Sequence, residues 1–323
     1  MLGILGAGAF GQALAITASR ALQERAVLQP VWMWARRQES VDAWSQTHGT
    51  QHPSVKVTTD LAQLAQQTTA LVYALPAQVM RPFFSAKACA PLKAATRPLL
   101  IASKGIEAAS GLLLPQVAQD LQMPNPLAIL SGPHLAKELC APTSAPTIGL
   151  IAGEAASFVG HLAHKDFLLQ RTQDVTGVAF AGAFKNVMAL CAGVMRGENV
   201  PQNTQSAFLA KGLWLMQQMS VLWGAQQETC LEPALLADYI LTTGSSASRN
   251  TRAGMLLGQG QPFDFLKDQP LAEGVLTLKA LQKRLQKKAY IVPFVDALAL
   301  RVFKAKPLCW AQLLKDGFCL QKC

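Results

Sequence analysis

Charged residues are scarce in this chain of 323 residues: 15% are Asp, Glu, Lys or Arg, whereas 50% are hydrophobic. A chain with so little charge and so many apolar side chains is expected to bury a packed core, which excludes a disordered protein. The length fits two domains of ordinary size better than one. The sequence contains no linker rich in Ser or Pro, no low-complexity segment and no obvious repeat. We therefore expect two globular domains that adjoin each other.

Targeting signals and paired cysteines are also missing. No basic region precedes the first apolar run, which three glycines interrupt, and no apolar stretch reaches membrane-spanning length without Gly, Pro or charge. These absences predict a soluble, cytoplasmic protein without a signal peptide. The seven cysteines form no C-x-x-C pair, which favours reduced thiols. His161 and His164 have a chelating spacing, but no acidic or cysteine partner stands nearby, so we expect no metal site.

The formal net charge is +10, and basic residues are densest between residues 267 and 306. Such a group is typical of a solvated helical face, and it is also compatible with a nucleic-acid surface or with attraction of anionic small molecules. The chain has no recognised nucleic-acid motif and no aromatic interleaving, which favours the first interpretation and predicts no nucleic-acid partner.

The amino-terminal glycines have the G-x-G-x-x-G spacing of a nucleotide cradle, with Gly6, Gly8 and Gly11 after an apolar run over residues 2–5. A helical pattern follows over residues 8–22, which is the strand, turn and helix that this motif requires. A second apolar run, residues 31–34, ends at Ala35-Arg36-Arg37. NAD enzymes have an acidic residue here, whereas a guanidinium matches the 2′-phosphate of NADP(H). The sequence therefore predicts a site that prefers NADPH.

Further apolar runs alternate with helical patterns and predict a parallel sheet covered on both faces: residues 70–75, 98–102, 127–130 and 144–151. From about residue 176 the chain has helical patterns only. We therefore expect an α/β Rossmann-type dinucleotide-binding domain over residues 1–176, followed by an all-α substrate-binding domain over residues 177–323.

Four polar sites along the chain each allow two interpretations. Lys185 lies among Phe, Val, Met and Leu. Either it is buried, which would lower its pKa toward neutrality, or its side chain extends so that the amine reaches solvent. Residues 245–252, SSASRNTR, precede an apolar helix and form either an anion site or an ordinary N-cap with solvated arginines. Lys104 follows a buried strand at the edge that binds ligands, or lies in a solvated loop. His134 is either catalytic or a helix cap.

Taken together, these segments resemble the bacterial-type NAD(P)-dependent glycerol-3-phosphate dehydrogenase family. The motifs occur in the family's order: GAGAFG at 6–11, SKGIE at 103–107, SGPHLAKEL at 131–139, AGAFKN at 181–186 and SRNTRAGMLLGQG at 248–260. The resemblance covers nearly the whole chain. It implies a Rossmann-type domain followed by a helical domain, reduction of dihydroxyacetone phosphate to sn-glycerol 3-phosphate with NAD(P)H for glycerophospholipid synthesis, and a homodimer.

The resemblance also implies residue roles. Lys185 would be the general acid or base, Asp238 would support it, and Lys104 would contact both cofactor and substrate. The substrate phosphate would be held by Arg249 and Asn250, with Ser248 nearby. The remaining positions are assigned by motif: to the cofactor Gly6, Gly8, Ala9, Phe10, Gly11, Arg36, Arg37, Gly132, Ala136, Arg249 and Glu273, and to the substrate also Gly132, His134 and Asn186.

Three segments depart from the family pattern. Where the family has a glycine-rich GLGDL motif, this chain has Leu235-Leu236-Ala237-Asp238-Tyr239. Residues 202–207 lack the basic residue that the family has in this segment before the next helix. Near the carboxyl end, the family motif VEG is replaced by AEG, which begins at Ala272. Two alternatives to the family activity therefore remain at the level of sequence. They are a catalytically silent NADPH-binding protein and a reductase of another small phosphorylated ketone or oxo-acid.

Overall fold

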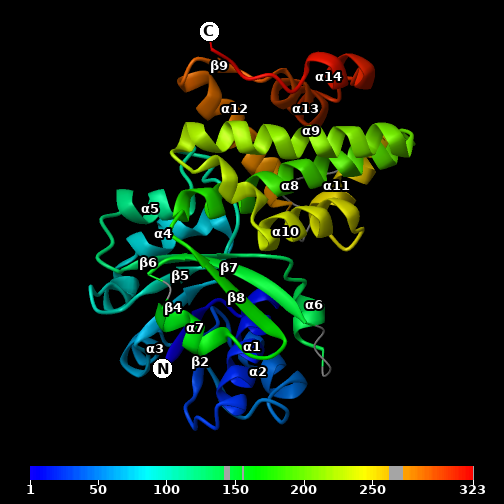
Figure 1. Ribbon diagram of the computed structural model, residues 1–323. Helices are drawn as coiled ribbons and strands as arrows, with labels where there is room; N and C mark the ends of the chain where they lie inside the picture. The colour runs from blue at the N-terminus through cyan, green and yellow to red at the C-terminus, as the bar shows by residue number, and fades with distance from the viewer. Residues whose placement is uncertain (142–145, 155, 262–271, 323) are drawn as a thin grey trace. The chain divides into compact units, whose positions relative to one another are not determined.

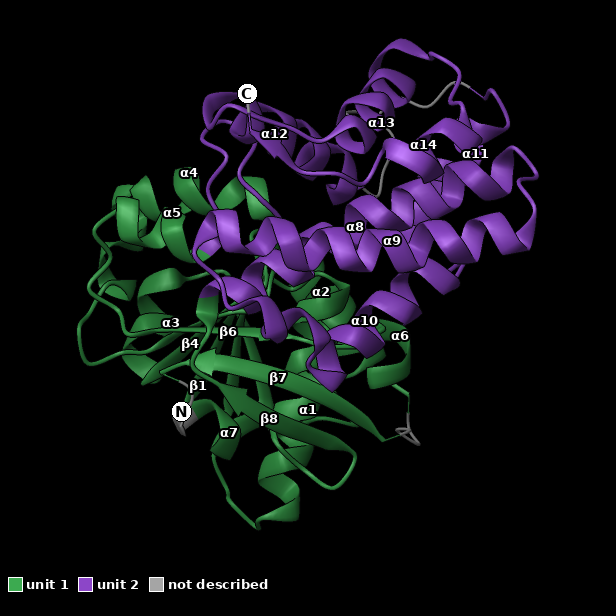
Figure 2. Cartoon of the chain, turned by 45° about the horizontal axis from the view of Figure 1, so that its top comes forward, with its two compact units in different colours: residues 1–103, 115–175 green, residues 104–114, 176–323 purple. Residues whose placement is uncertain are grey.

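The computed structural model describes residues 1–141, 146–154, 156–261 and 272–322. The chain forms two compact units: unit 1 comprises residues 1–103 and 115–175, and unit 2 comprises residues 104–114 and 176–323 (Figure 2). Residues 144–145 of the predicted strand 144–151, residues 267–271 of the basic stretch 267–306, and Cys323, one of the seven cysteines, lie outside the described residues.

Unit 1 is built on one sheet with the strand order β3-β2-β1-β4-β5-β6-β7-β8 (Figure 1). The strands are β1 (Leu2–Leu5), β2 (Val31–Trp34), β3 (Val55–Thr58), β4 (Ala70–Tyr73), β5 (Leu99–Ile101), β6 (Leu127–Ser131), β7 (Thr147–Gly153) and β8 (Phe167–Thr172). The strands from β3 to β6 are parallel to their neighbours. This order reverses direction at β1, as in Rossmann-type folds, and confirms the predicted fold class.

The sheet differs from the sequence-based expectation in three strands. β7 pairs with β6 in an antiparallel sense, so the sheet is mixed rather than wholly parallel. The sequence interpretation also ended the sheet at β7 and missed β3 and β8. An apolar run predicts a buried strand but not its direction. β3 and β8 lie at the two edges of the sheet and carry exposed polar side chains such as Lys56 and Gln170, which break the apolar pattern.

Short helices follow the strands of this part of the chain. They are α1 (Ala9–Glu24), α2 (Gln38–Thr47), α3 (Leu61–Gln67), α4 (Met80–Ser85), α5 (Leu114–Asp120), α6 (Ala136–Leu139) and α7 (Ala156–Leu162), with the 3₁₀ helices η1 (Ala77–Val79) and η2 (Lys87–Leu92). One apolar cluster joins α1 to the sheet and includes Leu14, Ile16, Ile4 and Val72, all with no exposed surface. This packing fixes the start of α1 at the end of β1.

Unit 2 is helical. Its helices are α8 (Val175–Gly197), α9 (Gln202–Ser220), α10 (Pro233–Gly244), α11 (Arg249–Gly258), α12 (Glu273–Lys287), α13 (Pro293–Lys304) and α14 (Trp310–Asp316), with η3 (Val221–Trp223) and η4 (Gln227–Leu231). The short strands β9 (Tyr290–Ile291) and β10 (Gln321–Lys322) pair in an antiparallel sense. Apart from this two-residue pair, the elements from α8 onward are helical, as predicted for this part of the chain. Residues 104–114, which the sequence interpretation placed in the dinucleotide-binding domain, belong to unit 2.

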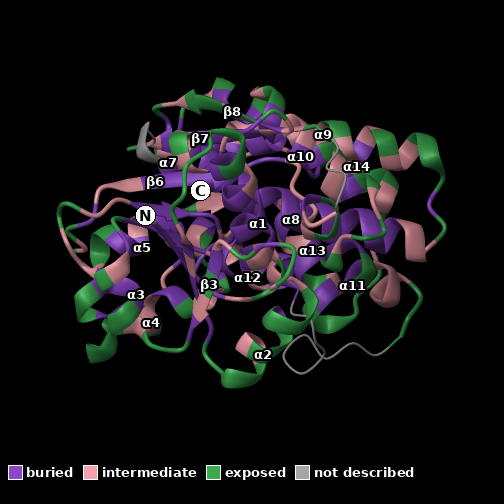
Figure 3. Cartoon of the chain, turned by 90° about the horizontal axis from the view of Figure 1, so that it is seen from below, coloured by how far each residue is buried: buried purple, intermediate pink, exposed green. Residues whose placement is uncertain are grey.

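The helix α8 is the core element of unit 2. It is the one helix in the described ranges that is long and apolar enough to cross a membrane, and its whole apolar window is buried inside the protein (Figure 3). Its apolar residues therefore serve as a core for the surrounding helices.

Glycines allow α8 and α11 to pack backbone against backbone. A Cβ added at Gly193 of α8 would lie 2.1 Å from the carbonyl oxygen of Thr251, and one at Gly254 of α11 would lie 2.1 Å from that of Leu190. One turn further on, Gly197 and Gly258 repeat the same reciprocal contact. Any side chain at these positions would separate the two helices, so the glycines determine where α11 begins relative to α8.

We expect Gly193→Ala to lower the free energy of unfolding by about 2–3 kcal/mol, because the added methyl group meets a backbone carbonyl that cannot rotate away. The matched control is Gly160→Ala in α7, where an added Cβ meets no atom within 4 Å. Urea unfolding followed by circular dichroism measures both variants. Equal midpoints for Gly193→Ala and Gly160→Ala would contradict the close packing.

Candidate active site

The glycine motif of unit 1 forms an open anion cradle at the start of α1. Gly6 has a φ of +119°, and a Cβ at Gly11 would lie 1.8 Å from the Gly6 carbonyl oxygen, so both positions require glycine. At Gly8, by contrast, an added Cβ meets nothing within 4 Å. No side chain of the described residues caps this end of α1, so its first N–H groups remain available to a phosphate.

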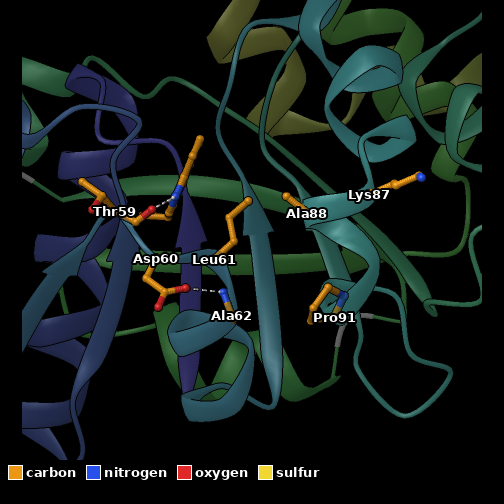
Figure 4. Close-up of a pocket in the computed structure, with 8 residues that line it drawn as sticks. Thr59, Asp60, Leu61, Ala62, Lys87, Ala88 and Pro91 are labelled. Carbon is orange, nitrogen blue, oxygen red and sulfur yellow. Dashed lines mark hydrogen bonds between the residues drawn. The ribbon is translucent and has the colours of Figure 1, made fainter.

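The two arginines after β2 are exposed to solvent, and Arg37 is the N-cap residue of α2. Trp34, two residues before Arg36, donates its indole N–H to the Thr59 carbonyl oxygen at 2.9 Å. A pocket of about 390 Å³ opens beside Trp34, lined by residues 59–62 and by residues of η2 (Figure 4). Together with the cradle, these features fit a dinucleotide whose 2′-phosphate meets a guanidinium.

His134 follows β6 in unit 1 and lies close to Phe10 of the cradle. Its Nε2 is 3.1 Å from the Ile148 carbonyl oxygen, and its ring lies 4.9 Å from that of Phe167 and 6.3 Å from that of Phe10. A Cβ at Gly132 would lie 2.8 Å from the His134 ring. The histidine is therefore packed into the wall beside the cradle, and Ala136 follows it as the first residue of α6.

Unit 2 brings two lysines and one aspartate into direct contact. Asp238 of α10 is 2% exposed and accepts from Lys104 Nζ at 2.5 Å through Oδ2. Its Oδ1 accepts from Nζ of Lys185, the buried lysine of α8. Lys104 reaches this position because residues 104–114 pack with unit 2, where Lys283 Nζ donates to the Ala109 carbonyl oxygen at 2.6 Å. Three residues predicted to act together thus form one ion-pair cluster.

Burial and neighbouring charge set the protonation of this cluster. Burial lowers the pKa of Lys185 to about 7; the Asp238 carboxylate opposes this change and the Lys104 ammonium adds to it. Burial alone would raise the pKa of Asp238, but the two ammonium groups hold it at about 2. The carboxylate therefore stays ionised at neutral pH, while Lys185 can gain or lose a proton there.

Thr242 is a member of this cluster that the sequence interpretation missed. Lys185 Nζ donates to its hydroxyl at 2.7 Å, and that hydroxyl lies 3.4 Å from Asp238 Oδ1. The Thr242 carbonyl oxygen in turn accepts from the hydroxyl of Thr251 at 3.0 Å, which ties α10 to α11. The spacing of Asp238 and Thr242, four residues apart on one helix face, was the available signal.

A second hydrogen-bond chain runs from α11 to the residue beside Lys185. Asn250 Nδ2 donates to Asn186 Oδ1 at 3.0 Å, and Asn250 Oδ1 accepts from the backbone N–H of Gly274 at 2.9 Å. All three residues are buried. The side chain of Asn250 thus joins the starts of α11 and α12 to α8, and Glu273 lies at the first position of α12.

The start of α11 carries the other predicted phosphate ligands. Ser248 caps the helix by accepting from the Thr251 backbone N–H at 3.3 Å, and Arg249 is exposed at the first helical position. The helix N-terminus and the guanidinium both favour an anion here.

Comparisons with known proteins agree with these features. Residues 1–156 match the family model for the NAD-dependent glycerol-3-phosphate dehydrogenase N-terminus, and residues 174–309 match the one for its C-terminus. The glycerol-3-phosphate dehydrogenase (NAD(P)+) of Zymomonas mobilis is 33% identical over 308 residues, which are 92% of this chain and 87% of that protein. The Rhodospirillum rubrum protein of the same name is 32% identical over 309 residues, 92% and 86% of the two chains.

A solved structure shows the same architecture. The crystal structure of glycerol-3-phosphate dehydrogenase from Coxiella burnetii is 25% identical, has a TM-score of 0.83 and covers 97% of both chains. Since the two family matches span both parts of the chain and the sequence relatives exceed 30% identity over most of their own length, this chain belongs to the NAD-dependent glycerol-3-phosphate dehydrogenase family.

Proposed function

We propose that this protein reduces dihydroxyacetone phosphate to sn-glycerol 3-phosphate with NADPH, for glycerophospholipid synthesis, and that NADH can replace NADPH. The observation that carries the proposal is the buried cluster of Lys104, Lys185 and Asp238, in which one lysine has a pKa of about 7. The named relatives are glycerol-3-phosphate dehydrogenases, which supports this substrate. In this proposal residues 1–176 form the dinucleotide-binding domain and residues 177–323 the substrate-binding domain.

The chemistry at the carbonyl follows from the charges of the cluster. Bound NADPH supplies the hydride for the carbonyl carbon. Lys185 gives its Nζ proton to the carbonyl oxygen, and in the reverse direction it takes the proton back from the hydroxyl. Lys104 polarises the same carbonyl with its ammonium group. Asp238 stays ionised and, with Thr242, holds Lys185 in a single orientation.

The remaining residues hold the two ligands. We assign the substrate phosphate to Arg249 and to the N–H groups at the start of α11. The side chain of Asn250 is engaged with Asn186 and Gly274, so we assign it a contact through its backbone N–H. Binding the phosphate orients the ketone, several bonds away.

For the cofactor, the cradle of Gly6, Gly8, Ala9, Phe10 and Gly11 would hold the pyrophosphate, and Arg36 and Arg37 the 2′-phosphate. The Trp34 pocket would take the adenosine end. Gly132, His134, Ala136 and Glu273 complete the proposed binding positions. We further propose a cytoplasmic homodimer, on the family resemblance alone.

The activity is tested by following NADPH oxidation with dihydroxyacetone phosphate. We expect turnover by the wild type and a loss of about 10²–10⁴-fold in kcat for Lys185→Met, because the proton donor is gone. Lys279→Met, an exposed lysine of α12, is the control and should retain full activity. Binding of NADPH without turnover by the wild type would refute the proposed reaction. Equal kcat/KM for unphosphorylated dihydroxyacetone would refute the phosphate anchor.

The rate should depend on pH through Lys185. Its protonated form donates in the reduction, so kcat falls as pH rises through about 7, while the oxidation of glycerol 3-phosphate gains rate over the same range. Asp238→Asn removes the group that raises this pKa and shifts both profiles to lower pH. Lys104→Gln removes a group that lowers it and shifts them to higher pH. Shifts of the same sign in the two variants would contradict the assignment.

The preference for NADPH should depend on the arginines after β2. We expect Arg36→Asp or Arg37→Asp to reduce the ratio of kcat/KM for NADPH to that for NADH by roughly ten- to a hundredfold, the value of a hydrogen bond to a charged group. Lys137→Asp, an exposed position in unit 1, controls for the change of charge. An unchanged ratio in both arginine variants would mean that neither residue reads the 2′-phosphate.

A further inference from the structure

The net charge of the chain is concentrated near its carboxyl end. Residues 279–322 contain ten Lys and Arg but two Asp and Glu, so this segment carries +8 of the total of +10. The rest of the chain is nearly neutral, at +2. The proposed active site does not account for this uneven distribution, since its lysines and arginines lie outside this segment.

The segment folds into one structure within unit 2. Gln282 of α12 donates to Asp296 of α13 at 3.0 Å, and the Phe294 backbone N–H donates to the Gly317 carbonyl oxygen, after α14, at 2.8 Å. β9 and β10 pair, which brings Lys322 opposite Tyr290. Figures 1 and 2 both show α12, α13, α14 and the carboxyl end gathered together.

Eight lysines of this segment are exposed, and two of them, Lys283 and Lys288, donate to backbone carbonyl oxygens. We call the other six the basic surface: Lys279, Lys287, Lys304, Lys306, Lys315 and Lys322. Within the described part of the chain, none of the six has a carboxylate within ion-pair distance. The two arginines of the segment are engaged inside unit 2. Arg284 lies over the Trp223 ring, and Arg301 pairs with Glu198 at 2.8 Å.

Apolar side chains are exposed on the same elements. Leu300 is 49% exposed and Phe303 40% exposed, both on the face of α13 that also carries Lys304, while Ile291 of β9 is 43% exposed. Leu300, Phe303 and Lys304 are three or four residues apart or adjacent, so one helix face presents both charge and apolar surface. Helices that lie in a membrane interface combine the same two features, with cations at the headgroups and apolar side chains below them.

We propose that the basic surface binds an anionic lipid bilayer, with Leu300 and Phe303 entering the headgroup region. The exposed cations are all lysines, which act as point charges and lack the planar donor fork that reads nucleic-acid phosphates and bases. Each lysine near an anionic membrane adds attraction that salt screens within about a Debye length. A nucleic acid would use the charges but would gain little from an exposed leucine, so the bilayer explains more of the surface.

Sedimentation of the full-length protein with vesicles tests the proposal. We expect binding to phosphatidylcholine mixed with phosphatidylglycerol, none to phosphatidylcholine alone, and release at high salt. The variant Lys279→Glu/Lys287→Glu/Lys304→Glu/Lys306→Glu should lower the partition coefficient by roughly a hundredfold or more, since each lysine neutralised costs about fivefold. The matched control is Lys56→Glu/Lys137→Glu/Lys165→Glu/Arg171→Glu in unit 1, all exposed residues, which should bind like the wild type.

A second variant separates lipid from other polyanions. Leu300→Gln/Phe303→Gln should weaken vesicle binding by roughly tenfold through lost apolar burial while leaving the salt dependence unchanged. Its melting temperature and dehydrogenase rate in solution establish that it is folded. The proposal is overturned by absent binding to the anionic vesicles, by equal losses in the two four-residue variants, or by tighter binding to duplex or single-stranded DNA than to the vesicles at the same salt concentration.

Discussion

The carboxylate of Asp238 lies inside unit 2 with a lysine ammonium on each of its oxygens, and the proposed chemistry depends on this arrangement. Removing one partner of a buried ion pair leaves an uncompensated charge, which is far costlier than losing a surface pair. The cluster carries one carboxylate against two ammonium groups, so one lysine is poised to release its proton. Burial makes Lys185 that residue, with a pKa of about 7, and a lysine in solvent would stay protonated there.

Backbone packing places this cluster. The glycine contacts bring α8 and α11 together at a distance that any side chain would increase. At that distance Asn250 donates a hydrogen bond to Asn186, and the Thr251 hydroxyl donates to the carbonyl oxygen of Thr242. The hydroxyl of Thr242 in turn accepts from Lys185. One hydrogen-bond chain thus links the start of α11 to the proposed proton donor Lys185, and a second links it to the neighbouring Asn186. Phosphate binding and proton transfer therefore rest on the same helix contact.

Charged side chains are arranged differently in the buried cluster of Lys104, Lys185 and Asp238 and on the basic surface. In the buried cluster each charge has a partner, and the result is a shifted pKa. On the basic surface no carboxylate of the described residues pairs with a lysine, and the summed charge of the lysines gives a long-range field. The first arrangement suits chemistry on one small molecule, and the second suits attachment to an extended anionic surface.

The sequence by itself determined the strand, turn and helix of the cradle, because only glycine fits Gly6 and Gly11. It also determined the helical nature of the chain after residue 176. The order of the motifs identified Lys104, Lys185 and Asp238. The residue types around Lys185 did not decide whether its amine is buried in the core or lies in solvent. Tertiary structure decided the antiparallel β7, the edge strand β8 and the role of Thr242. An apolar run carries no strand direction, and a threonine gains a function only from the lysine that another helix brings to it.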